Sequence, residues 1–405
     1  MSEHVIIVGA SHAGAGAASA LRQMGFGGDI TLIGEESVAP YHRPPLSKAY
    51  LSGETDRDAL LLRPEASYAQ AGIALRLGER VGAIGLEDRT VQLESGERLG
   101  WDRLVLATGA RVRRLPVPGA DLPGVHYLRD TADVDAIRAQ VAPGRPAVII
   151  GGGYIGLETA ASLTKLGMEV TLLEAQDRIL QRVTSEVMSD FYRSVHAAEG
   201  VRILEGCIAS EIQESGDGLL VETSCGQSLA AHLVVIGIGV IPNGELAAFA
   251  GLEVGNGIVV NEFCQTSHPD VFAIGDVAQQ RSVLYGRDVR IESVPDATEQ
   301  AKTVARFITG TPTAHDALPW FWSDQFDLKL QIAGLSDGHD AVVLRGDPAS
   351  RSFAAWYFAG DRLLAVDAVN APRDFMTARM ALGKGKTVDK AVLADPQAEL
   401  KSALR

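Results

Sequence analysis

The sequence predicts an α/β protein with two Rossmann-like dinucleotide-binding domains and a C-terminal α/β domain. Three observations carry this prediction. Residues 5–14, "VIIVGASHAG", and residues 147–156, "AVIIGGGYIG", each join an apolar, β-branched run to a glycine-rich turn. A helical pattern and a second apolar strand ending in glutamate follow each turn, in the order of a mononucleotide-binding unit. From about residue 318 the composition changes, and three of the four tryptophans lie beyond this point.

The bulk composition is that of a soluble globular protein. With 405 residues, 46% of them hydrophobic and 22% charged, the chain is long enough for two or three domains. A net charge of −14 argues against a nucleic-acid partner, because phosphate binding needs a concentrated basic face. The apolar runs fall short of the ~18 residues that a membrane span needs, and the N-terminus lacks the basic region of a signal peptide. We therefore expect a cytoplasmic protein without membrane association and without a metal site.

The first part of the chain predicts one nucleotide-binding domain. Residues 5–9 form a buried strand, residues 13–25 a helix with small residues toward the sheet, and residues 29–36 a second strand. In the segment 40–53, "PYHRPPLSKAYLSG", three prolines bar regular structure until Leu46. We expect a stiff loop there that leads into a short helix.

The same order of elements then returns. Residues 81–110 alternate apolar and polar residues and predict a β-meander followed by a buried strand. Residues 146–180 repeat strand, glycine turn, helix, strand and acid, and residues 218–243 repeat the meander and the buried strand. This repetition predicts an internal duplication. The run "DVFAIGDVA" (270–278) is a further strand, and its best place is in the first domain.

These elements predict three domains. The first is discontinuous, because the strand at 270–278 returns to it after the second domain. The third comprises residues 318–405, where the alternation in "RSFAAWYFAGDRLLAV" (351–366) is typical of a hairpin.

The second glycine turn carries a complete dinucleotide fingerprint. Gly151 makes the tight turn, Gly153 lets the backbone approach a pyrophosphate, and Gly156 lets helix and strand pack closely. The helix N-terminus offers N–H groups to the phosphates. Glu174 ends the next strand about 20 residues later, as expected of an acid that binds a ribose 2′-OH. Such a carboxylate favours NAD over NADP, although Arg178 nearby weakens this preference.

The first glycine turn is incomplete. Gly9 and Gly14 match the outer positions of the fingerprint, but Ser11 replaces the middle glycine. A serine is tolerated there if its backbone φ is negative, and its hydroxyl can bind a phosphate. Glu35 again supplies a ribose acid at the expected spacing. On these residues alone, an α/β turn that binds no nucleotide remains open.

Two later segments favour a nucleotide in the first turn. The run "ATG" (107–109) ends a buried strand at a crossing between domains, and Asp276 lies at the C-terminal end of another strand. Two dinucleotide sites in one chain suggest a permanently held flavin and a nicotinamide nucleotide that exchanges.

The cysteines give no sign of a thiol-based centre. Cys207, Cys225 and Cys264 are odd in number, and no two of them form a C-x-x-C pair. A disulfide scaffold, a zinc ribbon and a redox dithiol therefore lack support, and we expect three separate buried thiols.

Six motifs together resemble one known family. They are "YHRPPLSKAYL" (41–51), "LATGA" (106–110), "GGGYIGLE" (151–158), "FAIGDVA" (272–278), "ESVPDATEQA" (292–301) and "PWFWSDQF" (319–326). Along nearly the whole chain they are similar to the NADH-dependent ferredoxin reductases, the putidaredoxin-reductase-like FAD flavoproteins that serve cytochrome P450 and ring-hydroxylating dioxygenase systems. The resemblance implies a glutathione-reductase-like fold. FAD would bind the discontinuous domain, residues 1–107 and 241–317, and NAD the inserted domain, residues 108–240.

The resemblance also implies site residues. Lys48 would lie near the reactive edge of the flavin and pair with Glu158 as the catalytic group. The implied FAD contacts are Gly9, Ser11, His12, Ala13, Gly14, Glu35, Arg43, Pro44, Lys48, Val81, Ala107, Thr108, Gly109, Asp276, Val294 and Trp322. The implied NAD contacts are Gly151, Gly153, Tyr154, Ile155, Gly156, Glu174, Arg182 and Gly239.

Plainer roles for several of these residues remain open. Lys48 could be a solvated surface lysine, and Glu158 could only complement the helix dipole. Tyr154 could serve loop packing rather than gate the nicotinamide pocket. Trp320 and Trp322 could belong to the core, although the resemblance implies that one lies near the flavin and the partner surface.

The implied reaction is hydride transfer from NADH to FAD, followed by one-electron transfers to a [2Fe–2S] ferredoxin. Two alternatives remain: a rubredoxin reductase, and an NADH-sensing interaction module like the relatives of apoptosis-inducing factor. Because such ferredoxins are acidic, we expect a local basic patch near the C-terminal domain and a monomer or weak dimer. The candidate basic residues are Arg287, Arg290, Arg306 and Arg373.

Overall fold

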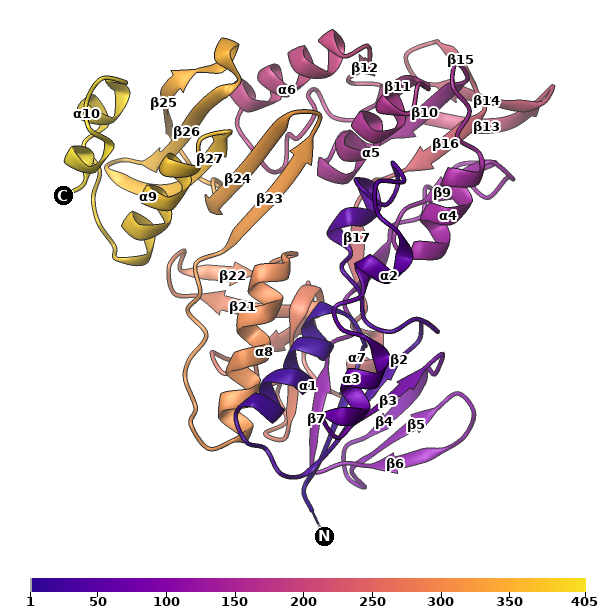
Figure 1. Cartoon of the computed structure of the whole chain (residues 1–405), viewed down its shortest axis with the longest axis vertical. Helices are drawn as coiled ribbons and strands as arrows, with labels where there is room; N and C mark the ends of the chain where they lie inside the picture. Colours follow the sequence, from indigo (N-terminus) through magenta and orange to yellow (C-terminus); the bar gives the residue numbers. More distant parts are fainter. Residues whose placement is uncertain (1) are drawn as a thin grey trace. The chain divides into compact units, whose positions relative to one another are not determined.

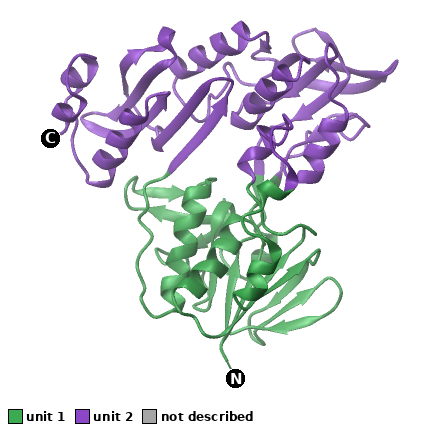
Figure 2. Ribbon diagram, in the orientation of Figure 1, with its two compact units in different colours: residues 1–42, 58–111, 241–319 green, residues 43–57, 112–240, 320–405 purple. Residues whose placement is uncertain are grey.

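The computed structural model describes residues 2–405, which form two compact units (Figure 2). Unit 1 contains residues 1–42, 58–111 and 241–319, and unit 2 contains residues 43–57, 112–240 and 320–405. The proposed division into three domains stays a prediction. No helix within residues 2–405 combines the length and the apolar character that crossing a membrane requires.

Unit 1 is built on a five-stranded parallel sheet with the strand order β20-β7-β1-β2-β3 (Figure 1). Its strands are β1 (His4–Val8), β2 (Asp29–Gly34), β3 (Ile73–Leu77), β7 (Arg103–Leu106) and β20 (Val271–Ala273). β1 pairs in parallel with both β2 and β7, and β20 pairs with the outer side of β7. The predicted place of the 270–278 strand in the first part of the protein is therefore confirmed.

The two faces of this sheet have different covers. Val5 and Ile7 belong to a buried cluster with α1 (His12–Gln23) and α8 (Val294–Ile308), while Ile6 and Val8 face the opposite side. This division follows from the two-residue period of a strand. A Cβ on Gly16 of α1 would lie 3.4 Å from Ala301 of α8, so small residues let these helices approach closely.

The opposite face is covered by β-structure. The antiparallel meander comprises β4 (Val81–Gly85), β5 (Thr90–Leu93) and β6 (Arg98–Gly100), and a further sheet comprises β18 (Val254–Gly255), β19 (Gly257–Val260), β21 (Ala278–Ser282) and β22 (Arg287–Val289). Three short helices complete this part of the chain: α2 (Arg57–Leu60), α3 (Glu65–Gln70) and α7 (Glu245–Phe249). The short strands β8 (Ala110–Val112) and β17 (Val240–Pro242) pair with each other.

Unit 2 repeats this plan, which confirms the predicted duplication. Its parallel sheet has the order β12-β11-β10-β16-β9, with β9 (Val125–Tyr127), β10 (Pro146–Ile150), β11 (Glu169–Leu173), β12 (Arg202–Leu204) and β16 (Leu233–Ile236). The helices of this part are α4 (Thr131–Ala139), α5 (Tyr154–Lys165) and α6 (Glu186–Ala198). The meander returns as β13 (Ala209–Ser215), β14 (Gly218–Thr223) and β15 (Ser228–Ala231).

The end of the chain adds an antiparallel sheet with the order β23-β24-β27-β26-β25 to unit 2 (Figure 1). Its strands are β23 (Trp320–Gln325), β24 (Leu328–Gly334), β25 (Ala341–Asp347), β26 (Ser352–Ala359) and β27 (Arg362–Val369). α9 (Pro372–Gly383) packs on β24 and β27, and α10 (Lys390–Ala394) follows. β26 and β27 form the predicted hairpin.

The proline loop differs from the prediction. A 3₁₀ helix, η1 (Pro44–Ser47), begins at Pro44 itself, so the expectation of no regular structure before Leu46 was wrong. Proline is tolerated in the first turn of a helix because that turn leaves its N–H groups unpaired and proline has a helical φ. The two prolines therefore start this helix rather than delay it.

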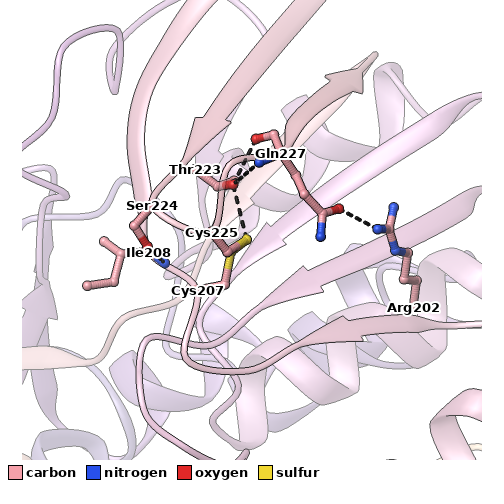
Figure 3. The surroundings of a disulfide bond; sticks show 7 residues. All are labelled: Arg202, Cys207, Ile208, Thr223, Ser224, Cys225 and Gln227. Atoms are coloured by element: carbon pink, nitrogen blue, oxygen red, sulfur yellow. Dashed lines mark hydrogen bonds between the residues drawn. A yellow bond between two sulfur atoms is a disulfide. The ribbon is translucent and has the colours of Figure 1, made fainter.

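The cysteines also differ from the prediction. Cys207 and Cys225 form a disulfide in unit 2, so the expectation of three separate thiols was wrong (Figure 3). The antiparallel pairing of β13 with β14 brings the segment before β13 beside the β14–β15 turn, and the two Cα atoms lie 5.4 Å apart. Cys264 is a buried free thiol, as predicted.

Candidate functional site

In the second glycine turn, between β10 and α5, two glycines are required by contacts within the protein, and the third faces open space. A Cβ on Gly151 would lie 2.4 Å from the carbonyl oxygen of Gly237, and one on Gly156 would lie 2.0 Å from that of Gly151. The protein's own backbone therefore requires these two glycines. A Cβ on Gly153 would meet nothing within 4 Å. The space in front of Gly153 is open for a pyrophosphate, as the fingerprint predicts.

The first turn, between β1 and α1, has the same construction. A Cβ on Gly9 would lie 2.1 Å from the carbonyl oxygen of Ala107, and one on Gly14 would lie 1.9 Å from that of Gly9. Ser11 has φ −127° and ψ −158°, close to the extended backbone of Gly153, whose φ is −81° and ψ −179°. The condition for tolerating serine at this position is therefore met. The residues present fit a second pyrophosphate.

The acids that follow each second strand are held differently. Glu174 accepts hydrogen bonds from the backbone N–H of Gly152 at 2.6 Å and of Gln176 at 2.8 Å, so its carboxylate is fixed beside the glycine turn. Glu35 has a 72% exposed side chain, and its nearest cation, Arg80, is 3.8 Å away. A fixed carboxylate is an acceptor ready for ribose hydroxyls.

Arg178, which the sequence left as a possible phosphate ligand, is turned into its own loop. Its guanidinium donates to the carbonyl oxygens of Gln181, Thr184 and Ser185 and to the hydroxyl of Ser189. These contacts hold the loop between β11 and α6 together and use the donors that a 2′-phosphate would need.

Asp276 lies at the same edge of the unit 1 sheet as the first glycine turn. It belongs to a short 3₁₀ helix, η2 (Gly275–Val277), directly after β20. A Cβ on Gly275 would lie 2.9 Å from that of Ala13 in α1, and the N–H of Gly275 donates to Gln300 of α8. The carboxyl ends of parallel strands are where such folds bind ligands.

The proline loop and α5 form a buried ionic cluster in unit 2. Lys48 Nζ lies 2.8 Å from Glu158 Oε2, and the side chains are 18% and 1% exposed. Ser47 Oγ donates to the same oxygen at 2.5 Å, and Ser323 Oγ donates to Glu158 Oε1 at 2.6 Å. Ser162 Oγ donates to the carbonyl oxygen of Ser47, which fixes the loop on α5. Both carboxylate oxygens of Glu158 are thus occupied, and its charge is matched.

Two aromatic groups lie near the start of α5 and along β23. The ring centroids of Tyr154 and Phe321 are 5.0 Å apart, and the hydroxyl of Tyr154 is buried with no hydrogen-bond partner among residues 2–405. Burial and the charge of Asp367 raise the pKa of Tyr154 well above its usual value. The ring centroid of Trp320 lies 5.7 Å from those of both Trp322 and Phe375, with the ring planes tilted.

The remaining predicted cofactor contacts are distributed over both units. Gly239 and Arg182 are close together in unit 2, because a Cβ on Gly239 would lie 3.6 Å from the guanidinium of Arg182. Arg43, Pro44, Lys48 and Trp322 belong to unit 2, whereas the other predicted FAD contacts belong to unit 1. Their contact with FAD stays a prediction.

One predicted surface cation does not suit a docking patch. Arg290 has a 10% exposed side chain, pairs with Glu292 at 2.7 Å and donates to the carbonyl oxygen of Asp276. Its inclusion among exposed docking residues was wrong, because its guanidinium packs against η2 and is largely buried there. Arg287 and Arg373 are exposed, and Arg306 is half-buried on α8.

Comparison with known proteins identifies the family. Residues 3–301 match the pyridine nucleotide-disulphide oxidoreductases, and residues 320–404 match a reductase C-terminal domain. The chain belongs to the putidaredoxin-reductase-like ferredoxin reductases. It is 44% identical to putidaredoxin reductase CamA of Pseudomonas putida, with 100% of this chain and 97% of that protein covered. These ferredoxin reductases are FAD-dependent oxidoreductases that use NAD(P)H.

Other relatives agree with this assignment. The ferredoxin reductase subunit of a 5,5′-dehydrodivanillate O-demethylase from Sphingobium sp. is 44% identical over 98% of this chain and 97% of its own length. The reductase in a covalent putidaredoxin reductase–putidaredoxin complex superposes with a TM-score of 0.97, at 44% identity, covering 99% of this chain and 98% of that chain. A rubredoxin-NAD(+) reductase of Pseudomonas putida is more distant, at 38% identity over 91% of this chain and 96% of its own length.

Sequence reasoning missed several members of the buried cluster. Ser47 and Ser323, which hold Glu158, lie within the quoted motifs but were given no role. Gln325 and His196, which continue the hydrogen bonding from Ser323, were also missed. No pattern in the sequence singles out Ser323 and Gln325, because Asp324 lies between them and the strand does not alternate polar and apolar residues.

Proposed function

We propose that this ferredoxin reductase takes a hydride from NADH onto FAD and passes electrons singly to a [2Fe–2S] ferredoxin that supplies a monooxygenase or dioxygenase. One observation carries the proposal: two dinucleotide turns of the same construction share the chain with a proline loop that carries an ion pair, not a thiol pair. When bound, FAD supplies the conversion between two-electron nicotinamide chemistry and one-electron iron–sulfur chemistry.

The turn of unit 1 is the proposed FAD site. Its outer glycines bring the N-terminus of α1 against β1, where backbone N–H groups and the helix dipole favour a pyrophosphate. Glu35 is placed to accept from a ribose hydroxyl, and Asp276 from the ribityl chain. Val294, at the first turn of α8, would supply an apolar contact to the ring system.

The turn of unit 2 is the proposed NADH site. Glu174 is already fixed by two backbone N–H groups, and a ribose 2′-OH can donate to it without reorganisation. A 2′-phosphate would meet this carboxylate and find the donors of Arg178 engaged elsewhere. These two features support NADH as the preferred donor. Tyr154, Ile155, Arg182 and Gly239 are the proposed neighbours of the nicotinamide half.

Lys48 and Glu158 are the proposed catalytic pair. Glu158 accepts three hydrogen bonds from buried or half-buried donors, and it holds the ammonium group of Lys48 in one place. A fixed cation of this kind stabilises negative charge that develops next to it without the cost of reorienting water. Hydride transfer needs no proton from a histidine, so His42 in the same loop is given no catalytic role.

The proposed ferredoxin surface lies on α9 and the start of β23. Met376 and Met380 are exposed on α9 beside the exposed Arg373, and the guanidinium of Arg379 lies 5.1 Å from the ring centroid of Trp320. Apolar and basic groups together suit an acidic carrier, although the whole chain is acidic. Reduction of the ferredoxin is then expected to slow as ionic strength rises, because salt screens long-range attraction.

The test is an anaerobic titration of the purified holoprotein with NADH, followed by addition of candidate carriers. The proposal expects a yellow protein that bleaches with NADH and then reduces a [2Fe–2S] ferredoxin faster than a rubredoxin. Faster reduction of rubredoxin would contradict the ferredoxin as carrier and favour a rubredoxin reductase. Tight charge-transfer complex formation with poor turnover of every carrier would favour an NADH-sensing module, and a colourless protein would contradict the flavin.

A further inference from the structure

A chain of hydrogen bonds leads to Glu158 through the C-terminal sheet. His196 Nε2 lies 2.8 Å from Gln325 Oε1. Gln325 Nε2 donates to Ser323 Oγ at 3.1 Å, and Ser323 Oγ donates to Glu158 Oε1 at 2.6 Å. All four side chains are at most 1% exposed. The catalytic pair is therefore connected to α6 by three successive contacts that exclude water.

The alternation of β23 produces this chain. Ser323 and Gln325 are two residues apart and point to the same side of the strand, toward α5 and α6. Trp322 and Asp324, the neighbours of Ser323 in the strand, point to the other side, where the ring of Trp322 contacts that of Trp320 near α9. One strand therefore presents polar groups to Glu158 and aromatic groups to the proposed ferredoxin surface.

The donors of this chain all point the same way. His196 is neutral at pH 7, because burial lowers its pKa to about 4, and its Nε2–H faces the amide oxygen of Gln325. The amide nitrogen of Gln325 faces Ser323, which leaves the hydroxyl hydrogen of Ser323 for Glu158. Aligned donors polarise one another, and each makes the next a better donor. The chain ends on a carboxylate oxygen that only accepts.

Packing alone does not account for these residues. Ser323 and Gln325 pair across the strands with the apolar residues Leu330 and Leu328, both 1% exposed. A buried polar side chain costs free energy unless every donor is used, and two apolar residues would fill the same space without that condition. On this side of β23, Phe321 packs on Tyr154 of α5, whereas Ser323 and Gln325 are polar and buried. Two buried polar residues next to Glu158 point to a role for that acid.

We propose that Ser323, Gln325 and His196 are positioning residues for hydride transfer, which act by fixing the carboxylate of Glu158 and through it the ammonium group of Lys48. This inference rests on the proposed function, which makes Lys48 and Glu158 the catalytic pair. Without Ser323, Oε1 of Glu158 would lack a fixed position, because Lys48 and Ser47 both bind the other oxygen, Oε2. Ser323 is the only hydrogen-bond donor that the structure shows at Oε1 within residues 2–405.

The first experiment is anaerobic stopped-flow reduction of the holoenzyme by NADH. Ser323→Ala is expected to lower the limiting rate of flavin reduction about tenfold, the equivalent of one charge-assisted hydrogen bond, while the Kd for NADH changes less than about twofold. His196→Leu is expected to lower the rate about threefold, and His196→Gln, which keeps a donor for Gln325, to restore it. Reduction by dithionite, which uses no nicotinamide, should be the same in all variants.

A matched control separates positioning from packing. Tyr357→Phe removes a buried hydroxyl that donates at 2.6 Å to Asp367, another buried carboxyl of the same sheet. Its limiting rate is expected to equal that of the wild type. If Ser323→Ala does not retain FAD, Gln325→Met takes its place, because it leaves the hydroxyl of Ser323 and removes only the amide that orients it. Its limiting rate is then compared with that of Tyr357→Phe.

The second experiment does not depend on activity. Competitive acetylation by acetic anhydride, measured by mass spectrometry on the FAD-free and FAD-loaded protein, reports how firmly Lys48 is held. Ser323→Ala is expected to raise acetylation of Lys48 about threefold relative to the exposed Lys384, and Tyr357→Phe to leave it unchanged.

The outcomes distinguish this inference from the proposed function. If Lys48→Met slows flavin reduction but Ser323→Ala and Gln325→Met change neither the limiting rate nor the acetylation of Lys48, the positioning role is overturned and the catalytic pair stands. If Lys48→Met itself leaves the limiting rate unchanged, the proposed catalytic pair is wrong, and the acetylation result alone decides whether the chain holds Lys48.

Discussion

Lys48 Nζ lies 2.8 Å from Glu158 Oε2, with the cation partly open to solvent and the acid buried. Replacing Lys48 by Met keeps the length of the side chain and removes its charge. We expect the limiting rate of flavin reduction by NADH to fall at least about tenfold, equivalent to ~1.4 kcal/mol of lost stabilisation. Stopped-flow measurement at saturating NADH checks this. Lys48→Arg, as a control, should retain more of the rate than Lys48→Met.

Coenzyme selectivity should depend on Glu174. Its carboxylate is fixed by the N–H groups of Gly152 and Gln176 and would repel a 2′-phosphate. In Glu174→Ala, kcat/KM for NADH should fall and the NADPH-to-NADH ratio of kcat/KM should rise about tenfold, which is ~1.4 kcal/mol. Initial rates with both coenzymes measure this. Arg178→Ala should leave kcat/KM for NADPH unchanged, because the guanidinium of Arg178 already donates to carbonyl oxygens of its own loop. A selective loss of NADPH activity in Arg178→Ala would show that Arg178 binds the 2′-phosphate.

Asp367 should make the protein less stable as the pH rises. Burial raises its pKa from 3.8 to about 6, despite hydrogen bonds from Thr184 and Tyr357. The folded state therefore binds the proton more tightly than the unfolded state. The contribution is complete below pH 4 and is lost as the pH passes 6, at a cost of at most about 3 kcal/mol.

Asp367→Asn cannot ionise and should remove this cost. We expect its melting temperature to exceed that of the wild type at pH 8, and the difference to be clearly smaller at pH 4.5. Scanning calorimetry at both pH values gives the comparison. Asp361→Asn, at a fully exposed position, serves as the control and should shift neither value. An Asp367→Asn protein that melts lower at pH 8 would mean that the charged carboxylate is stabilising.

The disulfide predicts a definite thiol count. Cys207 and Cys225 are joined, and Cys264 is buried with its thiol pKa raised by that burial. Ellman's reagent should therefore detect no thiol in the native protein, one after denaturation, and three after denaturation and reduction. Cys264→Ser should lower the last two counts by one. Three thiols in denatured protein that was never reduced would contradict the disulfide.

The sequence predicted the parts of the site that local backbone geometry determines. The glycine turns could be found because the fingerprint is a compact local pattern that follows one strand and begins one helix. Gly156 packs against Gly151 of the same turn, and Gly151 packs against Gly237, which follows the neighbouring strand β16. The duplication followed for the same reason, since each half repeats a complete local unit. A regular fold with strong local patterns is therefore accessible without the structure.

The parts that were missed depend on contacts between distant segments. Ser323 meets Glu158, and His196 meets Gln325, only when β23 folds beside α5 and α6, and no spacing in the sequence records these contacts. The Cys207–Cys225 disulfide similarly depends on the register of β13 with β14. The burial of Arg290 could not be predicted either, because its acceptor, the carbonyl oxygen of Asp276, lies in η2, 14 residues earlier in the chain.

The glycines of the second turn make opposite predictions for folding. Gly156→Ala places a methyl group 2.0 Å from the carbonyl oxygen of Gly151, so the turn must open, and we expect a loss of stability of several kcal/mol or no soluble protein. Gly153→Ala meets no atom of the chain within 4 Å. It should fold with an unchanged melting temperature and bind NADH less than about tenfold more weakly, because Ser11 carries a side chain at the same position of the first turn with a similarly extended backbone.

The first turn completes this comparison. Ser11 already has the extended backbone that Gly153 adopts, so Ser11→Gly should retain FAD and keep a melting temperature within about 2 °C of the wild type. Calorimetry and FAD content measure both effects. A large loss of FAD in Ser11→Gly would show that the serine hydroxyl itself binds the pyrophosphate. Retention of FAD would show that the backbone around Ser11 is sufficient, and that a serine at the middle position of the fingerprint leaves the cofactor site intact.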